Sequence, residues 1–180
     1  MTRRQVQLVV LCEDLQQEVF ARHFFIERGF HPRKITYIKS PKGKGAGEQF
    51  VREQYPREVQ AYRSRAAHLS LCLAVVIDAD TYSVEERINQ FDEALENASQ
   101  PERQPTDKIA IFVPKRNIET WIYFLRDEAV DEQTAYPKLS RESDCKPDVR
   151  KLVSQICPTS VPEDAPPSLH SACAELERIL

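Results

Sequence analysis

Seven consecutive apolar residues at positions 71–77 end at the sequence Asp78-Ala79-Asp80. The run has the length of a strand, and it lacks the alternation of apolar and polar residues that a half-buried strand shows. Strands of this kind are buried on both faces, as they are in parallel sheets covered by helices. The run therefore predicts an interior strand of an α/β domain, with two carboxylates at its carboxyl end.

The rest of the chain alternates between strand-like and helix-like patterns. Three more strands are predicted at residues 6–12, 33–39 and 108–113, and helices at residues 15–28, 48–67, 84–97 and from about 118 onward. Pro56 is expected to kink or split the second of these helices. Strands that alternate with helices favour a parallel sheet with right-handed crossovers. We predict an α/β three-layer fold around a central, mainly parallel four-stranded sheet.

The pattern weakens after residue 127. A short helix is predicted at residues 147–156, a proline-rich linker at 158–167 and an amphipathic helix at 168–180. The chain is long enough for one sizeable core. We therefore expect one main domain at residues 1–127 and a small helical C-terminal extension at residues 128–180 that packs on the same domain.

The composition is that of a globular protein, with 41% hydrophobic and 29% charged residues. Apolar runs stay well short of the roughly 20 residues that span a bilayer, and the first residues lack the apolar core of a signal peptide. The five cysteines are widely spaced and form no C-x-x-C pair, which argues against a zinc site and favours free thiols. We expect a cytoplasmic protein without a membrane partner.

Acidic residues follow two of the predicted strands. Asp78 and Asp80 lie two residues apart, and side chains at i and i+2 of a strand point the same way. Glu13 follows the first predicted strand, and the carboxyl ends of parallel strands form the rim where α/β proteins bind ligands. Like charges held close repel unless a cation lies between them, and carboxylate oxygens suit Mg²⁺ or Mn²⁺. The pattern favours a divalent metal site formed by Glu13, Asp78 and Asp80.

These acids also have a structural interpretation. An Asp after a strand often caps the next helix, and Glu13 could be a solvated loop residue. Ser83 and Glu86 already form an S-x-x-E capping box, however, and Asp14 with Gln17 gives a capping pair for the helix that follows Glu13. Because these helices have other caps, the metal interpretation is favoured.

Basic residues gather in segment 33–65, which carries nine Lys or Arg against three Glu, whereas residues 66–107 carry nine Asp or Glu against two Arg. This asymmetry fits a nucleic-acid groove beside an acidic metal site, and it fits equally two surface faces that complement each other. A glycine-rich loop at residues 40–47 could approach a phosphate through its backbone N–H groups, although it does not match a nucleotide P-loop. The candidate nucleic-acid contacts are Lys42, Lys44, Arg52 and Arg116.

A second chemical segment, residues 114–121, follows the last predicted strand and so lies on the same rim. Lys115 or Arg116 could hold a phosphate oxygen or stabilise charge in a transition state. Glu119 either complements the dipole of the helix that it begins or serves as a fourth carboxylate for metals.

The order of these motifs resembles the Toprim family. Its members occur in topoisomerases, primases, small ribosomal-RNA maturases and overcoming-lysogenization-defect nucleases, and they carry a Glu after the first strand and a D-x-D after a later one. Glu13, Asp78 and Asp80 match those positions, and Lys115 matches a basic residue that some members place after the next strand. The resemblance covers about residues 6–125 and includes small Toprim-like nucleases of phage-defence systems. Members often have Gly after the first Glu, whereas this chain has Asp14.

The resemblance implies Mg²⁺-dependent phosphodiester hydrolysis by a catalytic domain at residues 1–127, with Glu13 as a metal ligand or as a general acid or base. A partner such as an ABC-type ATPase, within a phage-defence complex, would accompany this activity. A non-catalytic Toprim-like sensor or scaffold is the alternative. A receiver-like phosphate domain is a third option, because Lys115 would suit it. A D-x-D phosphatase fits less well, because it carries its nucleophilic Asp after the first strand.

Overall fold

The computed structural model describes residues 4–43 and 45–180, and within them it has the predicted α/β architecture. The strands are β1 (Gln7–Cys12), β2 (Ile35–Lys39), β3 (Leu71–Val76) and β4 (Ile109–Phe112). The helices are α1 (Leu15–Glu27), α2 (Gly47–Ala66), α3 (Val84–Asn97), α4 (Glu119–Leu125), α5 (Lys146–Lys151) and α6 (Pro167–Leu176). The chain also contains short 3-10 turns at Pro32–Lys34 and Glu142–Cys145 and a π-helix at Leu152–Ile156. None of the helices in the described ranges is long and apolar enough to cross a membrane.

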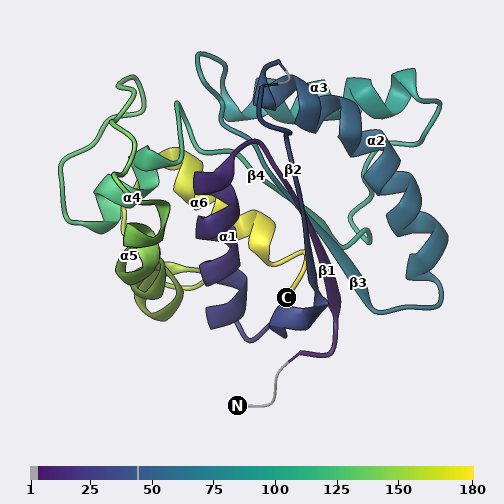
Figure 1. Cartoon of the computed structure of the whole chain (residues 1–180), viewed down its shortest axis with the longest axis horizontal. Coiled ribbons are helices and arrows are strands. Elements are labelled where there is room, and N and C mark those ends of the chain that lie inside the picture. The colour runs from purple at the N-terminus through teal and green to yellow at the C-terminus, as the bar shows by residue number, and fades with distance from the viewer. Residues whose placement is uncertain (1–3, 44) are drawn as a thin grey trace.

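The four strands form one all-parallel sheet in the order β2-β1-β3-β4. The α1 helix and the later helices α4, α5 and α6 cover one face, and α2 and α3 cover the other, as Figure 1 shows. Right-handed crossovers explain this division, because the chain moves one way from β1 to β2 and the opposite way from β2 through β3 to β4. The predicted three-layer α/β fold is confirmed.

Strand β3 is buried along its whole length, as its uninterrupted apolar sequence predicts. Its side chains alternate between two cores: Cys72, Ala74 and Val76 face the α1 side, and Leu73 and Val75 face the α2 and α3 side. Neighbouring strand β1 pairs with β3 from Gln7↔Leu71 to Cys12↔Val76. The two strands therefore end at the same level, which brings the residues that follow them to one rim.

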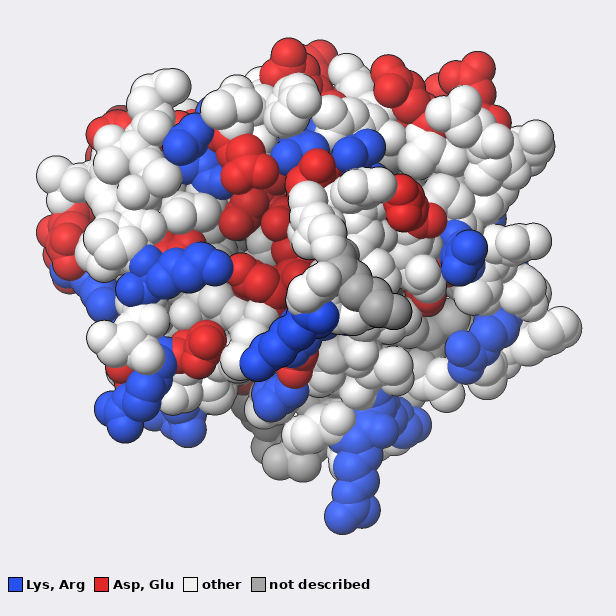
Figure 2. Space-filling view, turned by 45° about the horizontal axis from the view of Figure 1, so that its top comes forward, with Lys and Arg blue, Asp and Glu red and all other residues white. Residues whose placement is uncertain are grey.

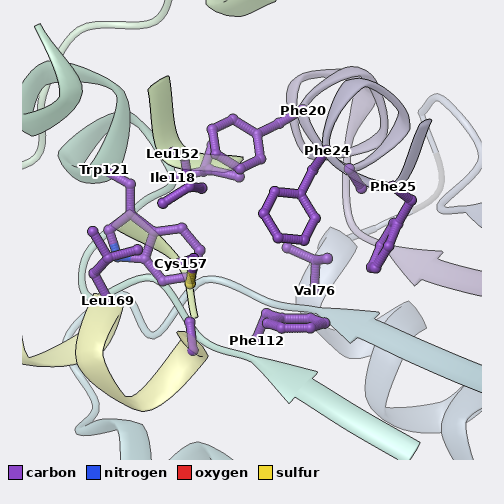
Figure 3. Close-up of a pocket in the computed structure, with 12 residues that line it drawn as sticks. Phe20, Phe24, Phe25, Val76, Phe112, Ile118, Trp121, Leu152, Cys157 and Leu169 are labelled. Atoms are coloured by element: carbon purple, nitrogen blue, oxygen red, sulfur yellow. The ribbon is translucent and has the colours of Figure 1, made fainter. Parts of the chain in front are cut away.

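Residues 128–180 build much of the core on the α1 side. Cys145, Val149, Leu152, Leu169 and Leu176 are buried there and belong to the same apolar cluster as α1 and α4. This core encloses a small cavity of about 40 Å³, shown in Figure 3. Because its lining is apolar throughout, the cavity is a packing defect that stays dry rather than a site for chemistry.

Helix α6 also protects the outer edge of β4. The Glu175 carboxylate accepts the Ile111 N–H at 2.8 Å, and Arg103 donates to the Ile109 carbonyl at 3.1 Å. Arg103 and Glu175 are themselves an ion pair. These two side chains take the hydrogen bonds that a further strand would take, so they close an edge that could otherwise pair with another chain.

The expectation of five free thiols is wrong, because Cys157 and Cys173 form a disulfide with a Cα–Cα distance of 5.4 Å. The bond joins the end of the π-helix to α6. Cys12, Cys72 and Cys145 are free and buried. Sequence spacing did not reveal the pair, because α6 packs back onto the segment that carries Cys157 only in the folded chain.

Two predicted elements differ in detail. The strand expected at residues 33–39 begins only at Ile35, because Pro32 opens a 3-10 turn whose first N–H group, that of Arg33, is capped by His31. Helix α2 continues across Pro56 rather than splitting there. Its buried face includes Tyr55 and Pro56 themselves, so packing offsets the one hydrogen bond that proline removes.

The contact between α6 and β4 yields a stability prediction. We expect Glu175→Ala to lower the free energy of unfolding by about 1–3 kcal/mol, because the Ile111 N–H and the Arg103 guanidinium lose their acceptor. Urea unfolding followed by circular dichroism measures the change. Glu177→Ala, at an exposed position two residues away, is the control and should change stability by less than about 0.5 kcal/mol. Equal effects of the two substitutions would contradict the role of Glu175.

Candidate functional site

The carboxyl ends of β1 and β3 hold two acids in contact. The Asp78 backbone N–H donates a hydrogen bond of 2.6 Å to Glu13 Oε1. The chain leaves β1 toward one face of the sheet and β3 toward the other, so the switch in strand order, where open α/β sheets bind ligands, lies between these two strands. The structure thus brings Glu13 and Asp78 together at the position expected for a site.

The start of α1 explains why Glu13 is available. Asp14 caps the helix by accepting the Gln17 N–H at 2.9 Å, as the sequence predicted. Gln17 is fully buried, and its side-chain oxygen accepts the Glu13 N–H at 2.9 Å. The neighbours of Glu13 therefore fix its backbone. Its carboxylate is not used in the cap and can accept the hydrogen bond from Asp78, just after β3.

A glycine from the basic loop lets α2 approach this point. A Cβ atom added to Gly47 would lie 3.0 Å from Glu13 Cβ and 3.1 Å from the Glu13 carbonyl oxygen. Both distances are shorter than ordinary contacts, so any larger residue would displace Glu13. Although no glycine follows Glu13 in sequence, Gly47 at the first turn of α2 provides the close approach from another segment.

The electrostatics of the pair are unfavourable for two negative charges. Burial raises the pKa of Glu13 to about 7, and the nearby charges of Asp80 and Asp14 add to the effect, whereas the Asp78 amide and Arg87 oppose it. Burial and the Glu13 charge also raise the pKa of Asp78 well above its ordinary value. Burial therefore disfavours the charged carboxylates, and a cation or a hydrogen-bond donor would favour them again.

Asp80 does not share a face with Asp78. Strand β3 ends at Val76, and Asp80 has a φ of 52°, so the alternation assumed from the sequence is broken. The Asp80 side chain is 57% exposed and pairs with Arg87 at 3.2 Å. Asp80 thus lies on the outer side of the rim.

Arg87 is a buried cation at the centre of this arrangement, and its side chain is 2% exposed. Its guanidinium donates to the Asp78 carbonyl at 3.0 Å and to the carboxylates of Asp80 and Glu48, both at 3.2 Å. The guanidinium also lies 4.6 Å from the centre of the Tyr82 ring. Arg87 therefore joins the turn after β3 to the first turn of α2.

The segment after β4 lies against the same turn, as predicted. Ala79 and Asp80 donate backbone hydrogen bonds of 2.8 and 3.1 Å to the carbonyls of Pro114 and Arg116. The Lys115 ammonium contacts the carbonyl oxygens of Tyr82 and Asp80. Lys115 is thus held beside the carboxylates through backbone contacts rather than through an ion pair.

Glu119 lies on the inner side of the rim. It is 2% exposed, and burial followed by the charge of Asp14 raises its pKa. Its charge also contributes to the raised pKa of Asp78. Glu119 is therefore near enough to Asp78 to act electrostatically as a further carboxylate.

The predicted nucleic-acid contacts have different environments. Lys42 lines a groove of about 480 Å³ that includes Glu13. Arg52 is paired with Glu48 at 2.7 Å. Arg116 has a φ of 65° and a buried Nε atom that finds no hydrogen-bond partner among the residues that the structure describes. Lys44 lies outside the described residues.

Figure 2 shows the charges on this side of the molecule. Asp and Glu side chains gather in the middle of the view, and Lys and Arg side chains lie around them. The groove beside Glu13 has the same mixture, because Lys39, Lys42 and Lys138 line it together with Asp14. An acidic centre with cations around it suits a ligand that carries a metal ion and a phosphate.

The donor chemistry fits a hard cation, but the carboxylates are held by internal contacts. Around the rim, the buried atoms Arg116 Nε and Glu119 Oε1 lack a hydrogen-bond partner within the described part of the chain. Gln17 Nε2 and Asp78 Oδ1 have no other partner there, and the two side chains lie close enough for the Gln17 amide to lower the pKa of Asp78. Such atoms are costly unless a ligand, ion or water satisfies them. Among the described residues, however, no set of three His, Cys, Asp or Glu side chains is arranged to hold a metal ion. Glu13 and Asp80 are instead engaged with an amide and with Arg87.

Sequence reasoning missed Arg87, Gly47 and the side-chain role of Gln17. For Arg87 a signal existed: it lies four and eight residues before Phe91 and Leu95, on the buried stripe of α3. A charged residue on an apolar stripe needs a buried partner. Gln17 was recognised only through its backbone contact with the Asp14 cap, and its side-chain contact with Glu13 was missed. Gly47 carries no comparable signal, because its role depends on a contact between two segments.

The chain was compared with protein-family models, with curated proteins and with solved structures, and no match was found in any of the three.

The raised pKa of Glu13 predicts how stability varies with pH. Its pKa rises from an ordinary 4.5 to about 7 on folding, so the folded chain binds the proton more tightly. The stability that protonation of Glu13 contributes to the fold is fully present below the pKa of Glu13 in the unfolded chain and is lost as pH rises through about 7. We expect wild type to lose about 2–3 kcal/mol relative to Glu13→Gln between about pH 5 and 8.

Urea unfolding at a series of pH values measures this difference. Glu85→Gln, at an exposed position on α3, makes the same charge change and should follow the wild-type profile. If the unfolding free energies of wild type and Glu13→Gln changed in parallel with pH, the pKa of Glu13 would not be raised by folding and the prediction would be wrong.

Proposed function

We propose that this protein is a metal-dependent nuclease of Toprim type that hydrolyses phosphodiester bonds in DNA or RNA. The observation that carries the proposal is the contact between Glu13 and the Asp78 segment at the switch in strand order, where both carboxyl groups have raised pKa values. Two half-buried acids that repel each other lower the stability of the fold, so their presence calls for a functional reason.

The carboxylates of Glu13, Asp78, Asp80 and Glu119 are the ligands that we propose for Mg²⁺ or Mn²⁺. Because no three of them are arranged to hold an ion within the described residues, Glu13 and Asp80 would have to leave their present contacts with the Asp78 amide and Arg87 to bind it. When bound, the metal would polarise the phosphate and stabilise the attacking and leaving oxygens. Glu13 has a second capability of its own, because a pKa of about 7 lets it take and return a proton near neutral pH. Water would then be the nucleophile, and no covalent residue is needed.

Cations around the acids support a phosphate substrate. Lys115 lies beside Asp80, and Arg116 has a buried Nε atom that lacks a partner within the described ranges. Lys42 lines the groove that reaches Glu13. These side chains would bind backbone phosphates and offset the charge of the transition state. From the Toprim resemblance we further propose a cytoplasmic role in phage defence with an ABC-type ATPase partner.

A non-catalytic sensor or scaffold is the second candidate, and Arg87 favours it. The guanidinium already neutralises Asp80 and holds the Asp78 carbonyl, so a cation is built into the rim. If Arg87 replaces a metal permanently, the rim is a rigid element for contact with the ATPase rather than a catalytic centre.

Cleavage assays distinguish the two candidates. Supercoiled DNA, single-stranded DNA and RNA are incubated with the protein and Mg²⁺ or Mn²⁺, with and without a candidate ABC-type ATPase partner. We expect cleavage by wild type and a loss of at least about 100-fold in Asp78→Asn and Glu13→Gln, because each removes a ligand from the metal.

Glu93→Gln, an exposed acid on α3, is the matched control and should cleave as wild type does. Wild-type protein that cleaves no substrate under any condition, but binds the ATPase, would support the scaffold. If Asp78→Asn still cleaves nucleic acid, this site is not the catalytic centre.

A further inference from the structure

Tyr82 is an exposed aromatic residue at the candidate site. It is 43% exposed, and within the described chain Leu15 and Leu69 are the other large hydrophobic residues with comparable exposure. A single exposed aromatic residue needs no explanation by itself. Tyr82 differs because it ends the turn that carries Asp78 and Asp80 and because its surroundings hold it in place.

Backbone contacts fix the position of Tyr82. Its N–H donates to the Ala79 carbonyl at 2.9 Å, and its own carbonyl accepts from Lys115. The Lys115 ammonium also contacts the Asp80 carbonyl. These contacts fix the backbone of Tyr82 relative to the segment that bears the carboxylates.

One face of the Tyr82 ring is covered by Arg87, whose Cζ lies 4.6 Å from the ring centre. Four acceptors hold this guanidinium: the Asp78 carbonyl and the side chains of Asp80, Glu48 and Gln90. Because Arg87 cannot move away, the ring keeps one orientation. A flat ligand would therefore have to stack on the face that Arg87 does not cover.

Other cations lie near Tyr82. Arg52 shares the Glu48 carboxylate with Arg87, at 2.7 Å and 3.2 Å respectively, and Lys115 contacts the Tyr82 carbonyl. An exposed aromatic ring with positive side chains nearby suits single-stranded nucleic acid, whose bases stack on aromatic rings and whose phosphates contact cations. In a duplex the bases are stacked on one another and their faces are hidden.

We propose that Tyr82 stacks on an unpaired base of a nucleic-acid strand whose phosphate lies at the carboxylates, so that the site takes single-stranded segments. The inference rests on the proposed nuclease function and specifies its substrate. A duplex would be bound only where a base is unpaired or turned out of the helix.

Fluorescence anisotropy tests the proposal with fluorescein-labelled single strands of DNA and RNA of about 12 nucleotides and with the matching duplex, with Ca²⁺ in place of Mg²⁺. We expect Tyr82→Ala to weaken single-strand binding by about 5- to 100-fold and to leave duplex binding unchanged. Tyr82→Phe and Tyr82→Trp should retain binding, because they keep the ring. Leu69→Ala, which removes an equally exposed side chain just before β3, is the control.

An abasic scan of the single strand sharpens the test. We expect one abasic position to weaken wild-type binding, and we expect Tyr82→Ala to show no further loss at that position. If Tyr82→Ala binds the single strand as tightly as wild type does, or loses as much affinity for the duplex, the stacking role is wrong. Neither result would contradict the proposed nuclease function. Wild-type protein that neither binds nor cleaves any nucleic acid would overturn the proposed function and this inference together.

Discussion

The hydrogen bond from the Asp78 amide to the Glu13 carboxylate joins the tips of β1 and β3 and sets the geometry of the whole rim. Three features of the fold meet there: the equal ends of two paired strands, the cap of α1 and the close approach of α2 through Gly47. Each of them supports the placement of an acid in a buried position. A fold that only had to be stable would place an apolar or neutral residue at this point.

Arg87 determines how this rim carries its charge. The guanidinium lies below the turn after β3, with acceptors on α2, on α3 and on the turn itself. A buried arginine with several partners fixes the positions of those partners more than it raises overall stability. The acids are consequently divided, with Asp80 on the outer side beside Arg87 and Glu119 on the inner side near Asp78.

Much of the sheet could be predicted from the sequence, because apolar runs and helical periodicity are local signals. The buried strand β3 and the helix α3, with its Ser83 cap, match their predicted ranges closely. The direction of the Asp80 side chain could not be predicted, because its left-handed φ depends on pairing with Arg116 across the rim. The Cys157–Cys173 bond was missed for a similar reason, since only tertiary packing brings these residues together.

The closure of β4 by Glu175 has a consequence for biosynthesis. Glu175 lies 64 residues after Ile111, so the nascent chain exposes the β4 edge well before α6 can reach it. An edge strand that is open during synthesis is a template for pairing with a second chain. A ribosome that stalls between β4 and α6 would therefore release a fragment that has all four strands but an unprotected β4 edge. Such a fragment would be prone to aggregate.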